Sequence, residues 1–217
     1  KGFCIAILNY TYGTNGIKAT PPNIVNYINK ETILKDIHSA QAVRPDAIIA
    51  CMHWGEEYQS LPNREQRELA DWLLEQGVTH IIGSHPHVIQ PMELREDGNR
   101  QHAVVYSLGN FISNMSAANT DGGLIFTLQL EKYPLPSPIH PLQGRLSYSP
   151  LPDSFIPSFP FSRVAQCGYT LVWTARPTLT GGKNYILYPS YSPIDQLPQA
   201  ARNRLNIFTK NSREFLF

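Results

Sequence analysis

The sequence predicts an α/β protein in which helices cover a parallel β-sheet. In the first hundred residues, short apolar segments typical of buried strands alternate with helical segments, and the links between them are short. The strand segments are Phe3–Leu8, Ala47–Met52 and Thr79–Ile82. Because a strand–helix–strand–helix–strand order favours one parallel sheet, we expect right-handed crossovers with helices packed on the sheet.

The first strand and the first helix are indicated by their apolar residues. Phe3–Leu8 is a nearly continuous apolar run, which is typical of a strand that is buried on both faces. The segment from Glu31 to Val43 carries Ile33, Ile37 and Ala40 along one helical face. We therefore expect this helix to pack on the sheet through that face.

The second helix is marked by its ends. Asn63 and Gln66 form a capping-box pattern at its start, and Gly77 is the type of residue that ends a helix. Farther on, Glu96-Asp97-Gly98-Asn99 has the composition of a turn.

The second half of the chain has a different pattern, with more strands and fewer helices. The expected elements are strands at Ala103–Leu108, Leu124–Leu130, Gly168–Thr174 and Asn184–Tyr188, and a closing helix at Gln196–Phe208. The last two strands are expected to form a hairpin around residues 180–183. Because Pro134–Pro160 is rich in proline and weakly periodic, we expect it to be a long surface connection or a set of edge elements. The expected domains are 1–133 and, packed on it, a Pro-rich connection with a β/helix extension at 134–217.

The composition excludes several classes of function. The 217 residues carry a formal net charge of +1 without a basic cluster, so no nucleic-acid partner is expected. No apolar run approaches the roughly 20 residues that span a bilayer. The three cysteines lack CxxC spacing, which excludes a disulfide scaffold and a zinc ribbon, and Cys4 and Cys51 are expected in the core. Because the apolar pattern starts directly after Lys1, we expect a further segment upstream.

The strongest chemical signal is Gly83-Ser84-His85-Pro86-His87, directly after the third strand. Open parallel sheets bind ligands where loops leave the carboxyl ends of strands. Pro86 restrains the backbone between the two histidines, and His53 follows the second strand in the same way. We therefore predict that His53, His85 and His87 bind a divalent metal ion such as zinc, manganese or iron.

Other polar residues follow the same strand ends. Asn110 follows the strand Ala103–Leu108 and is expected to reach the site. Glu56 and Glu57 are adjacent, so at most one of the two carboxylates faces the site. Trp54 lies beside the site and can both pack and contact a substrate.

The loop Asn9–Gly16 follows the first strand and is rich in groups that bond to a ligand or to their own backbone. Tyr12 and Asn15 of this loop are predicted, with Trp54, to contact a substrate.

The remaining histidines are expected to be surface or capping residues. They are His38, His80, His102 and His140. Asp36-Ile37-His38 imitates an Asp-x-His metal motif, but it lies inside a predicted helix whose Ile37 faces the core. This segment is therefore not expected to bind metal.

Taken together, these segments resemble the bacterial capsule-synthesis and poly-gamma-glutamate-synthesis family, a branch of the calcineurin-like metallophosphatases. The resemblance extends over about residues 3 to 130, and its order and intervals fit. The matching stretches are Asn9-Tyr10-Thr11-Tyr12-Gly13-Thr14-Asn15-Gly16, His53-Trp54-Gly55-Glu56-Glu57-Tyr58, Gly83-Ser84-His85-Pro86-His87-Val88 and Tyr106-Ser107-Leu108-Gly109-Asn110-Phe111.

This resemblance implies a two-sheet sandwich flanked by helices, with two metal ions at the strand ends. His53 and His85 would bind one ion and His87 the other, with Glu57 and Asn110 as catalytic residues. The family's earlier ligands, which include an Asp-x-His pair and a bridging Asp, would lie upstream of Lys1. The N-terminal part of the domain is therefore expected to be missing here, and the isolated chain is expected to bind metal weakly and to be inactive.

The function that the resemblance implies is phosphoester hydrolysis by a two-metal site in the synthesis of an envelope polymer. A non-catalytic subunit of a polymer synthesis and export complex is one alternative, and an amide hydrolase or transpeptidase acting on polyglutamate is another. The expected partners are the protein's own upstream segment, an envelope polymer or phosphoester substrate, and a membrane-bound synthesis complex. The expected location is the cell envelope, outside the cytoplasm.

Overall fold

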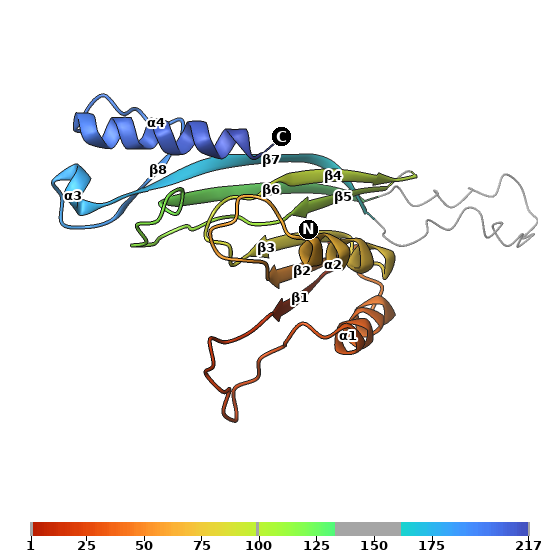
Figure 1. Cartoon of the computed structure of the whole chain (residues 1–217). Helices are drawn as coiled ribbons and strands as arrows, with labels where there is room; N and C mark the ends of the chain where they lie inside the picture. Colours follow the sequence, from red (N-terminus) through yellow and green to blue (C-terminus); the bar gives the residue numbers. More distant parts are fainter. Residues whose placement is uncertain (1, 99, 133–161, 217) are drawn as a thin grey trace, which may run out of the picture.

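The computed structural model describes residues 2–98, 100–132 and 162–216, so the proline-rich connection predicted at Pro134–Pro160 lies outside the described residues. The described strands form a five-stranded and a three-stranded sheet, with helices packed beside both (Figure 1). The predicted α/β class, with two sheets flanked by helices, is confirmed.

The five-stranded sheet contains the predicted parallel core. In spatial order its strands are β1 (Ile5–Thr11), β2 (Ala47–His53), β3 (His80–Ser84), β5 (Arg100–Val105) and β4 (Met92–Asp97). The first four are parallel neighbours, and β4 pairs antiparallel with β5 across a turn at Gly98. Strand β4 was not predicted, because charged residues such as Glu93 and Arg95 interrupt its apolar ones.

Two helices cover one face of this sheet beside β1–β3 (Figure 1). Helix α1 (Lys30–Ala42) buries Ile33, Ile37 and Ala40, as predicted. The predicted capping box is present at the start of helix α2 (Arg64–Glu75). Both helices share one buried cluster with side chains of β2 and β3, so the apolar faces read from the sequence are the faces that build the core.

The prediction that the first strand is buried on both faces is wrong. Ala6 and Leu8 pack against the helix-covered core, but the alternate residues Ile5 and Ile7 are 36% and 67% exposed. Strand β1 is an edge strand of the described sheet: β2 pairs with one side of it, and the other side makes an isolated bridge from Thr11 to Tyr27. Cys4, which was expected in the core, is also exposed, because it precedes this edge strand.

The second sheet belongs to the C-terminal half. It consists of β6 (Gly122–Lys132), β7 (Ser162–Ala175) and β8 (Ile186–Pro189), and helices α3 (Pro177–Thr180) and α4 (Gln199–Glu214) follow β7 and β8. The predicted β7–β8 hairpin is confirmed. Helix α4 runs beside this sheet (Figure 1) and shares a core with it through Leu171, Trp173, Leu205 and Phe208. No helix in the described residues is both long and apolar enough to cross a membrane.

Two of the histidines expected at the surface are buried instead. His80 is 3% and His102 is 7% exposed. The ring Nδ1 of His80 accepts a hydrogen bond from the Ala103 amide at 3.1 Å, and Nδ1 of His102 lies 3.0 Å from the Thr79 carbonyl oxygen. The error has a physical cause, since backbone partners on neighbouring strands satisfy both rings, and sequence alone does not show such partners. His38 is exposed, as predicted.

The buried His80 makes acid stability testable. Burial, and secondarily the positive charge that His102 can carry, lowers the pKa of His80 to about 4. Because the folded state disfavours the protonated ring, its stabilising contribution is present above the unfolded pKa of about 6.5 and is lost as pH falls toward 4. When the pH is lowered from 7 to 5, the titration of His80 alone should decrease the unfolding free energy by about 2 kcal/mol.

Urea unfolding of the wild type and of His80→Asn at both pH values measures this loss. The Asn side chain offers an amide oxygen to the Ala103 amide but has no titrating ring. The variant should therefore lose about 2 kcal/mol less than the wild type between pH 7 and pH 5. An equal loss in the two proteins would contradict the assignment of acid sensitivity to His80.

Candidate metal centre

The candidate site lies where the parallel strands β1, β2 and β3 end. In the register of the sheet, Thr11 is opposite His53, and His53 is opposite Ser84. The chain continues from these positions into the loops that carry Tyr12 and His85. Parallel pairing therefore places these loops together at the carboxyl ends of the strands, as the sequence predicts.

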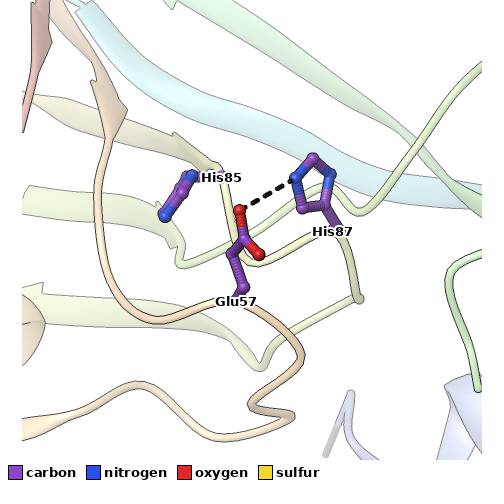
Figure 2. A group of neighbouring side chains, drawn as sticks. All are labelled: Glu57, His85 and His87. Atoms are coloured by element: carbon purple, nitrogen blue, oxygen red, sulfur yellow. Dashed lines mark ion pairs between the residues drawn. The ribbon is translucent and has the colours of Figure 1, made fainter. Parts of the chain in front are cut away.

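Three side chains converge at these strand ends. One ligand atom each from Glu57, His85 and His87 lies within 4.8 Å of the other two. Figure 2 shows the Glu57 carboxylate between the two rings, and its Oε1 lies 3.8 Å from Nε2 of His87. Two imidazoles and one carboxylate form a donor set that suits zinc and related divalent ions. The residues present therefore fit a metal ion.

Backbone geometry turns both histidines toward this space. His85 and His87 have φ values of 104° and 61°, in the left-handed region that residues with a side chain rarely adopt. The Tyr58 amide donates to the Pro86 carbonyl at 2.8 Å, and the Trp54 amide donates to the Ser84 carbonyl at 3.1 Å. These bonds join the Glu57 loop to the histidine loop, so the surrounding structure supports the unusual backbone.

His53 lies beside this group but is not a member of it. Its ring centroid is 4.6 Å from that of His85, and its Nδ1 lies 2.9 Å from Oγ1 of Thr11. The Thr11 hydroxyl donates its one hydrogen to the Gly13 carbonyl, so its oxygen accepts from Nδ1 of His53. Nε2 of His53 is then left with a lone pair for a ligand.

The orientation of His87 is determined by Asn110, which follows β5. Nδ2 of Asn110 donates to the Thr120 carbonyl at 2.8 Å, so the amide oxygen Oδ1 faces Nδ1 of His87 at 2.9 Å. An amide oxygen only accepts, and Nδ1 therefore carries the hydrogen. The lone pair on Nε2 points toward Glu57 and the shared space, as a metal ligand requires.

The electrostatic environment favours neutral rings. Burial, followed by the nearby His87, lowers the pKa of His53. Burial, followed by His53, also lowers the pKa of His85, although the Glu57 carboxylate opposes this shift. Because imidazole binds metal only when it is deprotonated, both rings are available at neutral pH.

A cavity of about 510 Å³ adjoins the site between the ends of β1 and β2 and the starts of the two helices. Tyr12 and Trp54 line it, and the Tyr12 ring lies 4.4 Å from the His85 ring. Trp54 is almost fully buried and donates to the Tyr106 carbonyl, so it also packs the core. Asn15 does not line the cavity, although its side chain accepts a hydrogen bond from the Tyr12 hydroxyl.

The remaining acidic candidates lie apart from the cluster. Glu56 accepts a hydrogen bond from the Asn63 side chain and lines the cavity instead. Asp36 accepts one from the Tyr10 hydroxyl in the helix-covered core. Asp36 and Ile37 therefore contribute to the packing of α1, while His38 is exposed.

The fold and this cluster define a mixed α/β protein with a candidate metal centre at the strand ends of a parallel sheet. Residues 1–115, more than half of the chain, match the family described as bacterial capsule synthesis protein PGA_cap. The chain belongs to this family.

Two curated relatives are similar to the chain. It is 31% identical to the capsule biosynthesis protein CapA of Bacillus anthracis over 133 residues, which cover 58% of this chain and 31% of the relative. It is 34% identical to the PGA biosynthesis protein CapA of Bacillus subtilis (strain 168) over 87 residues, which cover 40% of this chain and 22% of the relative. The matched part thus spans less than a third of either relative.

Substitution of Gly83 tests the packing that supports the site. A Cβ at this position would lie 2.0 Å from the Tyr106 carbonyl oxygen and 2.6 Å from Nε1 of Trp54. Gly83→Ala should therefore lower the unfolding free energy by about 2 kcal/mol or more, as overpacking does. Gly13→Ala is the matched control, because a Cβ at Gly13 would meet nothing within 4 Å. Urea unfolding that gives equal stabilities for the two variants would contradict this packing.

Proposed function

We propose that this chain contributes a metal-dependent hydrolytic centre to the synthesis of a bacterial envelope polymer. The observation that carries the proposal is the convergence of Glu57, His85 and His87 within 4.8 Å. Family membership and the names of the relatives, one for capsule and one for PGA biosynthesis, support the biological context. Phosphoester hydrolysis is the proposed reaction, and the cell envelope is the proposed location.

Glu57, His85 and His87 would hold one ion, and three protein ligands leave a position for water or substrate. We further propose that His53, with its free Nε2, contributes to a second ion, and that an upstream segment of the protein supplies the other ligands. The outer edge of β1 at residues 5–8, which no described strand covers, offers a place for that segment. A bound divalent ion would polarise the scissile group and make a hydroxide available near neutral pH.

The residues of the chain have separate tasks in this proposal. Asn110 keeps the hydrogen on Nδ1 of His87 and so directs Nε2 toward the metal position. The cavity beside Tyr12 and Trp54 would seat the part of the substrate next to the scissile bond. Glu57 is proposed as a ligand rather than a proton carrier, because its carboxylate lies in the group itself.

A second candidate is hydrolysis or transfer of an amide bond in polyglutamate. The name of the Bacillus subtilis relative, a PGA biosynthesis protein, favours it. The same metal position would polarise an amide carbonyl, so the two candidates differ in substrate and not in ligands.

The test measures metal binding by this chain and activity of the full-length protein. His85→Ala should weaken Mn²⁺ or Zn²⁺ binding, measured by calorimetry, by more than the roughly 10–100-fold typical of outer-shell changes. It should also abolish hydrolysis of bis(p-nitrophenyl) phosphate. His38→Ala changes an exposed histidine on α1 and should leave both properties unchanged.

Two results would decide against this reading. Equal metal affinity in the wild type and His85→Ala would contradict the proposed metal centre. A wild type that binds metal but cleaves neither the phosphodiester nor a γ-glutamyl peptide would favour a non-catalytic assembly subunit.

A further inference from the structure

Asn110 opens a loop that the C-terminal part of the chain holds in place. The loop, residues 110–121, joins the candidate site to β6, and it is called here the Asn110 loop. Side chains from β7, the segment after it, and α4 contact this loop at several points. They pair Thr174 with the Phe111 carbonyl, Arg176 with the carbonyls of Asn114 and Met115, Asn211 with Asn119, and Arg204 with Asp121.

The strongest of these contacts is the ion pair between α4 and the end of the loop. Nε and Nη2 of Arg204 each donate to a different oxygen of Asp121 at 2.6 Å. Nε1 of Trp173 donates to the same carboxylate at 2.8 Å. The Asp121 side chain is only 10% exposed, and a carboxylate buried to this extent needs its cationic partner.

From Asp121 a short series of contacts leads to the candidate metal ligand. The neighbouring residue, Thr120, is fully buried, and its carbonyl accepts from Nδ2 of Asn110 at 2.8 Å. That bond aims Oδ1 of Asn110 at Nδ1 of His87, 2.9 Å away. The hydrogen on His87 therefore depends on where the Thr120 carbonyl lies.

We propose that Arg204 is a positioning residue of the metal centre, which acts through Asp121, Thr120 and Asn110 on His87. The proposal rests on the proposed function, because it assigns His87 as a metal ligand. It also gives the C-terminal part a role in the site. Thr120, Asp121 and Arg204 all lie beyond the family match at residues 1–115. The orientation of the His87 ring therefore depends on residues outside that match.

The mechanism is geometric. Without the guanidinium, Trp173 is the remaining side-chain donor to the Asp121 carboxylate among the described residues, and the segment relaxes toward solvent. The Thr120 carbonyl then moves with it, and the Asn110 amide is free to rotate. His87 loses the acceptor that selects its Nδ1–H form, so its Nε2 is presented to metal in only part of the molecules.

The experiment reads the His87 ring directly. Two-bond ¹H–¹⁵N spectra of the metal-free whole chain at pH 8 report which ring nitrogen carries the hydrogen, and the His87→Gln spectrum identifies the signals. Co²⁺ titration followed by visible absorption gives metal affinity. Both are measured for the wild type, Arg204→Met and Arg204→Lys. Arg163→Met is the control, since Arg163 on β7 pairs with Glu131 in an exposed ion pair.

The wild type should show the Nδ1–H form of His87. Arg204→Met should show a mixture of both forms and bind Co²⁺ about tenfold more weakly, the lower end of outer-shell effects. Arg204→Lys should fall between them, because lysine keeps the charge but not the bidentate geometry. Arg163→Met should match the wild type in both readouts.

A folded Arg204→Met with wild-type His87 signals and wild-type Co²⁺ affinity would overturn the proposal. If Arg204→Met does not fold, Arg204→Lys decides: a mixture of His87 forms supports the proposal, and unchanged signals overturn it. The proposed function fails separately. A wild type that binds no Co²⁺, or binds it as weakly as His85→Ala does, would contradict the metal centre. The metal-free spectra would still show whether Arg204 determines which ring nitrogen of His87 carries the hydrogen.

Discussion

The parallel pairing of β2 with β3 places His53 directly opposite Ser84, and the rest of the site depends on this register. A shift by one residue would turn the side chains of one strand to the other face and separate His53 from His85. The buried cluster of Ile48, Ile81 and the two covering helices holds the register. Core packing therefore determines where the candidate ligands Glu57, His85 and His87 meet, although none of the three belongs to the buried cluster.

The histidine loop shows how a folded scaffold supports an unfavourable local conformation. Two non-glycine residues with positive φ in one loop cost about 1–3 kcal/mol each. Hydrogen bonds from the Trp54, Tyr58 and Leu108 amides to the loop and the end of β3 oppose this cost. The conformation brings His85 and His87 to face Glu57, so the strain coincides with the place where a ligand set is formed.

Much of this arrangement could be predicted from the sequence, because it follows from local patterns. The helix faces through Ile33 and Ile37, the capping box at Asn63 and the strand ends before His53 and His85 are all encoded within short segments. The burial of His80 and the exposure of Ile7 could not be predicted in this way. Both depend on which strands are neighbours in the sheet, and that information is distributed over the chain.

The same distinction applies to the site itself. His85 and His87 lie two residues apart and could be recognised as a pair, whereas the link from Asn110 to Arg204 joins residues far apart in the sequence. Arg204 is one of several arginines in an amphipathic helix, and no local signal distinguishes it from Arg202. Its contact with Asp121 becomes visible only when α4 is packed on the second sheet.

The most direct measurement is anomalous diffraction from crystals of this protein soaked in Zn²⁺. We expect a peak at about 2.0–2.2 Å from a carboxylate oxygen of Glu57 and from ring nitrogens of His85 and His87, the usual zinc distances. At His87 the ligand should be Nε2, with Nδ1 still bonded to Asn110. Peaks confined to other acidic side chains, or no peak among these three residues at saturating Zn²⁺, would contradict the account.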